Sequence, residues 1–146
     1  MLLHLDTKCI RYLNGCRVTE QLLTLVPDKD VFRRTLHAVK LWAKRHGLYS
    51  NVLEYLAGVS WGILVERVCQ LHPNEGFQII LEHFFQVLSK WPWKRRVLLK
   101  KPEQYQEFGY DVCNPRQNVK VYHEVMPILT PAYSQQNSVL NVYDLR

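Results

Sequence analysis

The strongest helical pattern in the chain is DKDVFRRTLHAVKLWAKRHG, residues 28–47. Four apolar residues recur there at i, i+4, i+7 and i+11, which places on one helix face Phe32, Leu36, Val39 and Ala43. Three basic residues fill the last turn, and Gly47 follows as a residue that readily adopts the left-handed backbone of a helix C-terminus. The stretch therefore predicts an amphipathic helix that ends at this glycine.

The acidic pair at the start of this stretch allows two interpretations. Asp28 and Asp30 are spaced like paired carboxylates that hold metal ions for phosphoryl transfer. However, they follow Pro27 and precede a helix, where negative charge complements the helix dipole. No Gly-Ser turn lies upstream to seat a triphosphate. We therefore interpret the pair as the N-terminal charge of the helix rather than as a metal site.

Helical periodicity continues through the first 91 residues, so the predicted fold class is mainly α, a helical bundle with a core over about residues 19–91. We expect a short helix that opens at Thr19 and ends before Pro27, and a short helix over residues 50–56. A further helix is expected to be capped by Ser60 and to end before Pro73, with an inward face of Trp61, Leu64, Val65, Val68 and Leu71. The last is expected over residues 76–91, with an inward face of Phe77, Ile80, Leu81, Phe84, Leu88 and Trp91.

The C-terminal part of the chain has a different pattern. Five of the seven prolines follow residue 91, and they separate short extended pieces such as Val97-Leu98-Leu99. We expect an irregular, Pro-rich segment over residues 92–146 that wraps the bundle and forms no second core.

Composition narrows the classes of partner. The 146 residues are 47% hydrophobic, enough for one sizeable core, and their net charge is +6, which favours a polyanion partner. No apolar run approaches the roughly 18 residues of a membrane span, so no membrane partner is expected. The four cysteines form no Cys-x-x-Cys pair, which favours a reducing compartment. Cys69, His72 and His83 could be grouped as metal ligands, but a buried thiol and surface imidazoles explain them better, so no metal site is assigned.

Two neighbouring features could bind an anion. Arg33, His37, Lys40 and Lys44 share one side of the predicted helix, either as a solvated basic face or as a phosphate clamp. Downstream, Gly58-Val59-Ser60-Trp61 leads into a helix whose free N–H groups could hold an anion, although glycine before serine is usually only a loop. Tyr49 lies between the two features and could supply a ring or a hydroxyl.

A third basic run, Lys94-Arg95-Arg96, follows Trp91-Pro92-Trp93. Tryptophans interleaved with cations could grip single-stranded nucleic acid, and a solvated loop with its tryptophans turned inward is an equal alternative. We find no nucleophile elbow, Walker loop or dinucleotide fingerprint, so no catalytic residue is assigned in this chain.

An ordered set of motifs nevertheless resembles one family, the eukaryotic nuclear poly(A) polymerases. The resemblance covers nearly the whole chain and rests on NGCRVT (14–19), KLWAKRH (40–46), YSN (49–51), GVSW (58–61), CQLHPN (69–74), FF (84–85), SKW (89–91), VLLK (97–100), MPILTPAY (126–133) and QQNS (135–138). It corresponds to the central domain of that family. The nucleotidyltransferase domain with its three metal-binding aspartates and the C-terminal RNA-binding domain are expected to lie outside this chain.

The resemblance implies roles for individual residues. Asn14 would approach the ATP ribose, Lys40 and Lys44 would neutralise the triphosphate, and the Tyr49 hydroxyl would reach the phosphates. The adenine would be surrounded by Asn51, Gly58 and Val59, and Met126 would lie near the incoming base or the RNA end. ATP would be the substrate, and Mg or Mn would be bound outside this chain.

The resemblance also implies a setting. The full enzyme would add AMP to RNA 3′ ends in the nucleus. Its partners would be RNA, ATP, its own flanking domains and the machinery that processes mRNA 3′ ends, and residues 1–146 alone are expected to be inactive.

Two alternatives accompany this resemblance, and the chain departs from the family pattern at several positions, including Ser134, where the family commonly has proline. The chain could be the central domain of a related terminal uridylyltransferase, or a non-catalytic helical module that binds RNA or protein. Ala57 and Glu54 stand where the family commonly has glycine. If the family's glycine at position 57 needs a positive φ angle, alanine there costs about 1 kcal/mol.

Overall fold

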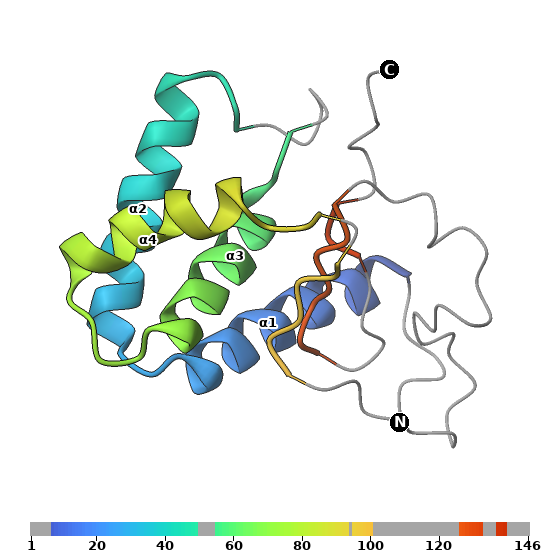
Figure 1. Cartoon of the computed structure of the whole chain (residues 1–146). Coiled ribbons are helices and arrows are strands. Elements are labelled where there is room, and N and C mark those ends of the chain that lie inside the picture. The colour runs from blue at the N-terminus through green and yellow to red at the C-terminus, as the bar shows by residue number, and fades with distance from the viewer. Residues whose placement is uncertain (1–6, 50–54, 94, 101–125, 133–136, 140–146) are drawn as a thin grey trace.

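The computed structural model describes residues 7–49, 55–93, 95–100, 126–132 and 137–139, and of residues 7–14 only the backbone. The described residues form four helices and no named strand, which confirms the mainly α fold class. The helices are α1 (Thr7–Leu25), α2 (Lys29–Arg45), α3 (Gly58–Leu71) and α4 (Phe77–Ser89). In Figure 1, α3 lies centrally, and it packs against each of the other three helices.

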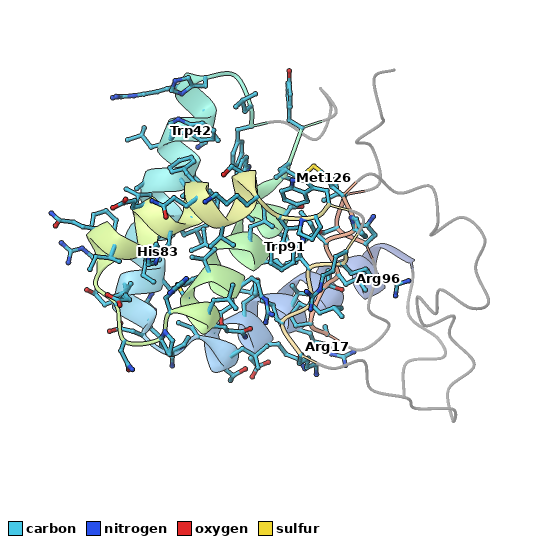
Figure 2. All side chains as sticks on the ribbon, in the orientation of Figure 1. Arg17, Trp42, His83, Trp91, Arg96 and Met126 are labelled. Atoms are coloured by element: carbon cyan, nitrogen blue, oxygen red, sulfur yellow. The ribbon has the colours of Figure 1, made fainter. Side chains whose placement is uncertain are left out.

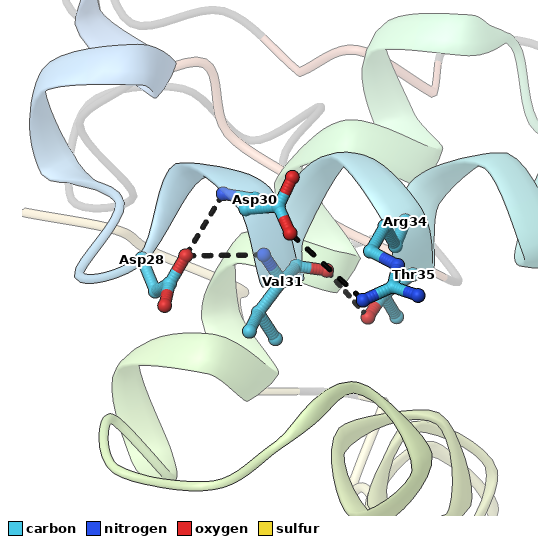
Figure 3. Close-up of polar contacts among 5 residues, drawn as sticks. All are labelled: Asp28, Asp30, Val31, Arg34 and Thr35. Carbon is cyan, nitrogen blue, oxygen red and sulfur yellow. Dashed lines mark hydrogen bonds and ion pairs between the residues drawn. The ribbon is translucent and has the colours of Figure 1, made fainter.

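The start of α2 agrees with the interpretation of the acidic pair. Asp28 is the N-cap, and its Oδ1 accepts hydrogen bonds from the N–H groups of Asp30 at 2.8 Å and Val31 at 3.1 Å (Figure 3). Asp30 lies in the first turn and forms an ion pair with Arg34, at 3.9 Å. Asp28 therefore caps the N-terminus of α2 with hydrogen bonds, and Asp30 places a negative charge near the positive end of the helix dipole.

The end of α2 is also as predicted. His46 is the C-cap, and Gly47 follows with a φ angle of +69°. The Leu48 N–H donates to the Ala43 carbonyl at 2.8 Å, and the Gly47 N–H donates to the Lys44 carbonyl at 3.2 Å. These two bonds make a Schellman motif, which satisfies the last carbonyls of the helix and fixes where the chain leaves it.

The core lies around α3, which is buried on almost every side from Ser60 to Cys69. Most of the predicted inward residues are buried, including Phe32, Val39, Ala43, Trp61, Leu64, Val65, Val68, Ile80 and Phe84. Leu71 was expected to face inward but is 43% exposed, because it is the last residue of α3 and extends beyond its neighbours.

Two predicted helix boundaries are wrong. Thr19 does not open a helix, because α1 begins twelve residues earlier, at Thr7, and the Thr19 hydroxyl donates to the Gly15 carbonyl at 2.9 Å. The helix expected over residues 50–56 falls mostly outside the described residues, and Tyr55 and Leu56, which are described, are not helical.

Short extended pieces from the Pro-rich part pack on the bundle. We call the described residues 95–100, 126–132 and 137–139 the strap. Val97 pairs in parallel with Ile128, and Leu129 pairs antiparallel with Asn137. Val97, Leu99, Ile128, Ala132 and Val139 join the same core as the helices. Residues 101–125 and 140–146 lie outside the described residues, so wrapping by the whole segment stays a prediction.

We expect Asn137→Ala to lower the stability of the fold by about 1–3 kcal/mol, because a buried side chain that makes three hydrogen bonds to two residues would be lost. Asn137 Oδ1 accepts from the N–H groups of Ile128 and Val139, each at 3.1 Å, and Nδ2 donates to the Val139 carbonyl at 3.1 Å. Thermal unfolding would measure the loss. Gln78→Ala, at an exposed position of α4, is the control, and an equal fall in both variants would contradict the role of Asn137.

Candidate anion-binding site at the start of α3

The N-terminus of α3 begins at Gly58 and has no side-chain cap. Its N-cap is Ala57, with φ −87° and ψ 173°, and the Trp61 N–H already donates to the Ala57 carbonyl at 3.2 Å. The positive end of the helix dipole and the N–H groups of the first turn are therefore available to an anion.

Ser60 is not the N-cap that its residue type predicted. It is the third residue of α3, it is buried, and its hydroxyl oxygen lies 3.1 Å from Ser138 Oγ and 3.3 Å from the Ser138 carbonyl oxygen. Trp61 Nε1 donates to the Leu56 carbonyl at 3.1 Å. These contacts fix the first turn of α3 to the strap and to the segment that enters the helix.

Ala57 needs no special backbone conformation. Its φ angle is negative and its backbone is extended, a conformation that alanine adopts without strain. The departure from glycine at this position therefore brings no φ penalty.

Lys40 and Tyr49 both approach Gly58, the first residue of α3. A Cβ atom placed on this glycine would lie 2.9 Å from the Tyr49 hydroxyl oxygen and 3.8 Å from Lys40 Nζ. Lys44 Nζ lies 5.2 Å from the centroid of the Tyr49 ring, within the range of a cation–π contact. Two ammonium groups, a phenol hydroxyl and a helix N-terminus thus share one site, a combination suited to a multiply charged anion such as a phosphate chain.

The surface beside this site is apolar. Val59 is 40% exposed and Tyr55 is 43% exposed, and the two flank the start of α3 in sequence. The sequence interpretation had not singled out Tyr55, although an aromatic residue three positions before Gly58 was a usable signal. Exposed apolar groups next to an anion site are suited to a ligand with a flat ring beside its phosphates.

The structure gives less information about the other candidate residues. Asn14 lies on α1, but its side chain is outside the described part, and Asn51 is outside it altogether. Met126 is half-buried in the strap and packs against the core. Arg33 and His37 are exposed on α2, two turns and one turn before Lys40.

The group Cys69, His72 and His83 does not form a metal site in the structure. Within the described ranges, no three residues among His, Cys, Asp and Glu are arranged to hold a metal ion. The imidazole rings of His72 and His83 are in contact, with centroids 4.1 Å apart and ring planes tilted by 37°. Burial, with smaller effects of the Glu66 and Asp28 carboxylates, raises the pKa of the Cys69 thiol to about 12, so a thiolate ligand is disfavoured there.

Neither a membrane span nor a disulfide is found in what the structure describes. Each helix among the described residues is too short or too polar to cross a bilayer. Of the cysteines whose side chains are described, Cys16 is exposed and Cys69 is buried, and both are free thiols.

Comparison with known proteins points to one family. Residues 31–145 match the family described as poly(A) polymerase central domain. The chain is 46% identical over 137 residues to nuclear poly(A) polymerase 1 of Arabidopsis thaliana, and 45% identical over 142 residues to nuclear poly(A) polymerase 4 of the same plant. These alignments cover 94% and 97% of the chain, but the chain spans only 19% of the length of each relative.

Proposed function

Since the chain belongs to the poly(A) polymerase central domain family, we propose that it supplies part of an ATP site for the addition of AMP to RNA 3′ ends. The observation that carries this proposal is the meeting of Lys40, Tyr49 and Gly58 at the uncapped start of α3. The relatives are named poly(A) polymerases, and their length leaves room for other domains.

Each residue has a distinct role in this proposal. Lys40 and Lys44 neutralise the triphosphate as mobile point charges, and the Tyr49 hydroxyl donates a hydrogen bond to a phosphate oxygen. Gly58, together with Val59, lets the adenine ring approach the backbone, which a larger residue would prevent. Asn14 and Asn51 complete the contacts to the ribose and the base, and Met126 lies near the RNA end.

The chain's contribution to the reaction is positioning and charge neutralisation. Adenylyl transfer moves AMP from ATP to the RNA 3′ hydroxyl and releases pyrophosphate, so negative charge builds up on the leaving group. The Lys40 ammonium beside Gly58 and the Lys44 ammonium over the Tyr49 ring would lower the energy of that charge before and during transfer.

The described residues do not fit a Mg or Mn site, since no group of three suitable ligands occurs among them. We therefore assign no metal-dependent step to this chain, and we place any metal ligands and the catalytic residues in the flanking domains. Residues 1–146 alone would then be inactive. In the nucleus, the setting that the relatives' names indicate, the partners would be RNA, the flanking domains and the machinery that processes mRNA 3′ ends.

The proposal is tested by Gly58→Ala, with Gly62→Ala as its matched control. A Cβ at position 58 must displace the Tyr49 hydroxyl, whereas a Cβ at position 62 meets only Leu22 Cδ1, at 3.6 Å. Gly62 lies inside α3, so Gly62→Ala is expected to raise helix stability by up to about 1 kcal/mol, whereas Gly58 is the first residue of the helix and gains less from alanine. Only Gly58→Ala is expected to weaken ATP binding, by about tenfold, or about 1.4 kcal/mol.

An NMR titration of the chain with millimolar ATP would measure the binding. Equal ATP binding by the two variants would contradict the proposal, as would ATP-dependent shifts in the unmodified chain that lie away from Lys40, Tyr49 and Gly58. Titration with UTP tests base preference, and equal affinity for UTP and ATP would favour a terminal uridylyltransferase over a poly(A) polymerase.

A further inference from the structure

The turn that follows α4 is basic and structurally fixed. Trp91 Nε1 donates to the Arg95 carbonyl at 3.0 Å, and the Arg95 N–H donates to the Pro92 carbonyl at 2.6 Å. The Trp91 and Trp93 side chains are half-buried and pack against the core. The tryptophans are therefore turned inward, and they form part of the support for the turn rather than a surface for stacking bases.

Arg95 and Arg96 begin the strap, and contacts of the residues that follow them hold their backbone in place. The Val97 N–H donates to the Pro127 carbonyl at 2.9 Å, and the Val97 and Leu99 side chains are buried in the core. Because side chains alternate along extended backbone, Arg96 lies on the face opposite Val97 and Leu99. Arg95 is exposed and Arg96 is partly exposed, so both guanidinium groups are held at the surface by an ordered backbone.

The sequence around these arginines carries an excess of positive charge. Residues 83–102 contain six Lys and Arg residues and no Asp or Glu. Among the described residues, no carboxylate forms an ion pair with Arg95 or Arg96. In the view of Figure 2, the labelled Arg17 and Arg96 side chains both lie on the side of the molecule that carries the strap, so α1 adds a further exposed arginine to that side.

We propose that Arg95 and Arg96 form a second anion-binding surface, which binds the phosphate backbone of an RNA strand. This inference rests on the proposed function, because it assumes that RNA is the polyanion that binds to this domain. A guanidinium group presents a planar fork of donors that matches phosphate oxygens, and neighbouring cations without partners are stabilised when phosphates approach them. The surface shares no residue with the site at Gly58.

The inward tryptophans give this proposal a specific consequence. With Trp91 and Trp93 packed on the core, the surface contacts phosphates and not bases. Binding through it is therefore expected to be independent of sequence, with equal affinity for oligo(A) and oligo(U), and to depend steeply on salt.

The test is the salt dependence of RNA binding by the 146-residue chain, measured as the fluorescence anisotropy of labelled oligo(A). Each single-strand phosphate contact contributes about 0.7 to the slope of log K against log salt. Arg95→Ala/Arg96→Ala is therefore expected to reduce the slope by about 1.4, and each single variant by about 0.7. Lys29→Ala, which removes an exposed charge at the start of α2, is the control and is expected to leave the slope unchanged.

The proposal is overturned if the slope of the double variant equals that of the unmodified chain, if Lys29→Ala reduces it as much, or if the unmodified chain does not bind oligo(A) at low salt. It is also overturned if polyglutamate competes as well as RNA at equal charge, which would indicate an acidic protein partner. ATP titration separates the two proposals. The double variant should bind ATP normally, and Gly58→Ala should keep the full RNA slope.

Discussion

Replacing Lys40 by alanine is expected to lower the affinity for ATP by about 10- to 100-fold and to leave the melting temperature almost unchanged. The Lys40 ammonium lies 3.8 Å from the position of a Cβ on Gly58, so its charge lies at the uncapped start of α3. A hydrogen bond to a charged group contributes about 1.5–3 kcal/mol, which gives this range of affinity. The side chain is only half-buried, so its loss removes little packing.

Arg33→Ala is the matched control for Lys40→Ala, because it removes one positive charge from the same side of α2, two turns away. NMR titration with ATP and thermal unfolding would be measured for both variants. Unchanged ATP affinity with a lower melting temperature in Lys40→Ala would assign the lysine a structural role. An equal loss of affinity in Arg33→Ala would mean that ATP responds to the overall charge of α2 and not to a site at Gly58.

The helix α2 could be predicted in detail because its signals are local. Its N-cap Asp28, its apolar periodicity and Gly47 all lie within twenty residues, and each works through contacts inside the helix. The start of α3 depends instead on a distant contact. Ser60 has the side chain of an N-cap, but its hydroxyl contacts Ser138, 78 residues away, and this contact cannot be inferred from local propensity.

The candidate site likewise has one part that depends on local signals and one part that depends on distant contacts. The spacing of Lys40 and Lys44 on one side of a helix followed from the sequence pattern alone. The approach of Lys40 to Gly58 requires the packing of α2 on α3. Nearness in sequence made this approach one of two open interpretations, and the resemblance to a known family favoured it. The burial of Glu66 was missed because one face of α3 was expected to be exposed, whereas α1, α2 and α4 all pack on this helix.

The stability of the fold is expected to fall as the pH rises from about 4.5 to about 8, because of Glu66. Burial raises the pKa of this carboxyl group from 4.5 to about 8, although Gln70 favours the charged form. Between these pH values the native state keeps a proton that the unfolded state has released, so unfolding releases a proton and becomes more favourable as the pH rises. The slope contributed by one group is at most about 1.4 kcal/mol per pH unit, and it vanishes below pH 4.5 and above pH 8.

Glu66→Gln is expected to remove this slope and to stabilise the protein by about 1–3 kcal/mol at pH 8, because the unfolded state no longer gains free energy by releasing a proton from residue 66. Glu66→Met is expected to stabilise at least as much, because methionine leaves no polar group to satisfy. The Gln70 side chain acts on the charge of Glu66, but no described residue, Gln70 included, meets hydrogen-bond geometry with either carboxylate oxygen. Glu75→Gln, at an exposed carboxylate, is the control. Denaturant unfolding of the four proteins at pH 5, 6, 7 and 8 gives the comparison. A slope that persists in both Glu66 variants would assign the pH dependence to other groups, and a loss of stability in both variants at pH 8 would mean that the ionised carboxylate has a partner that stabilises it.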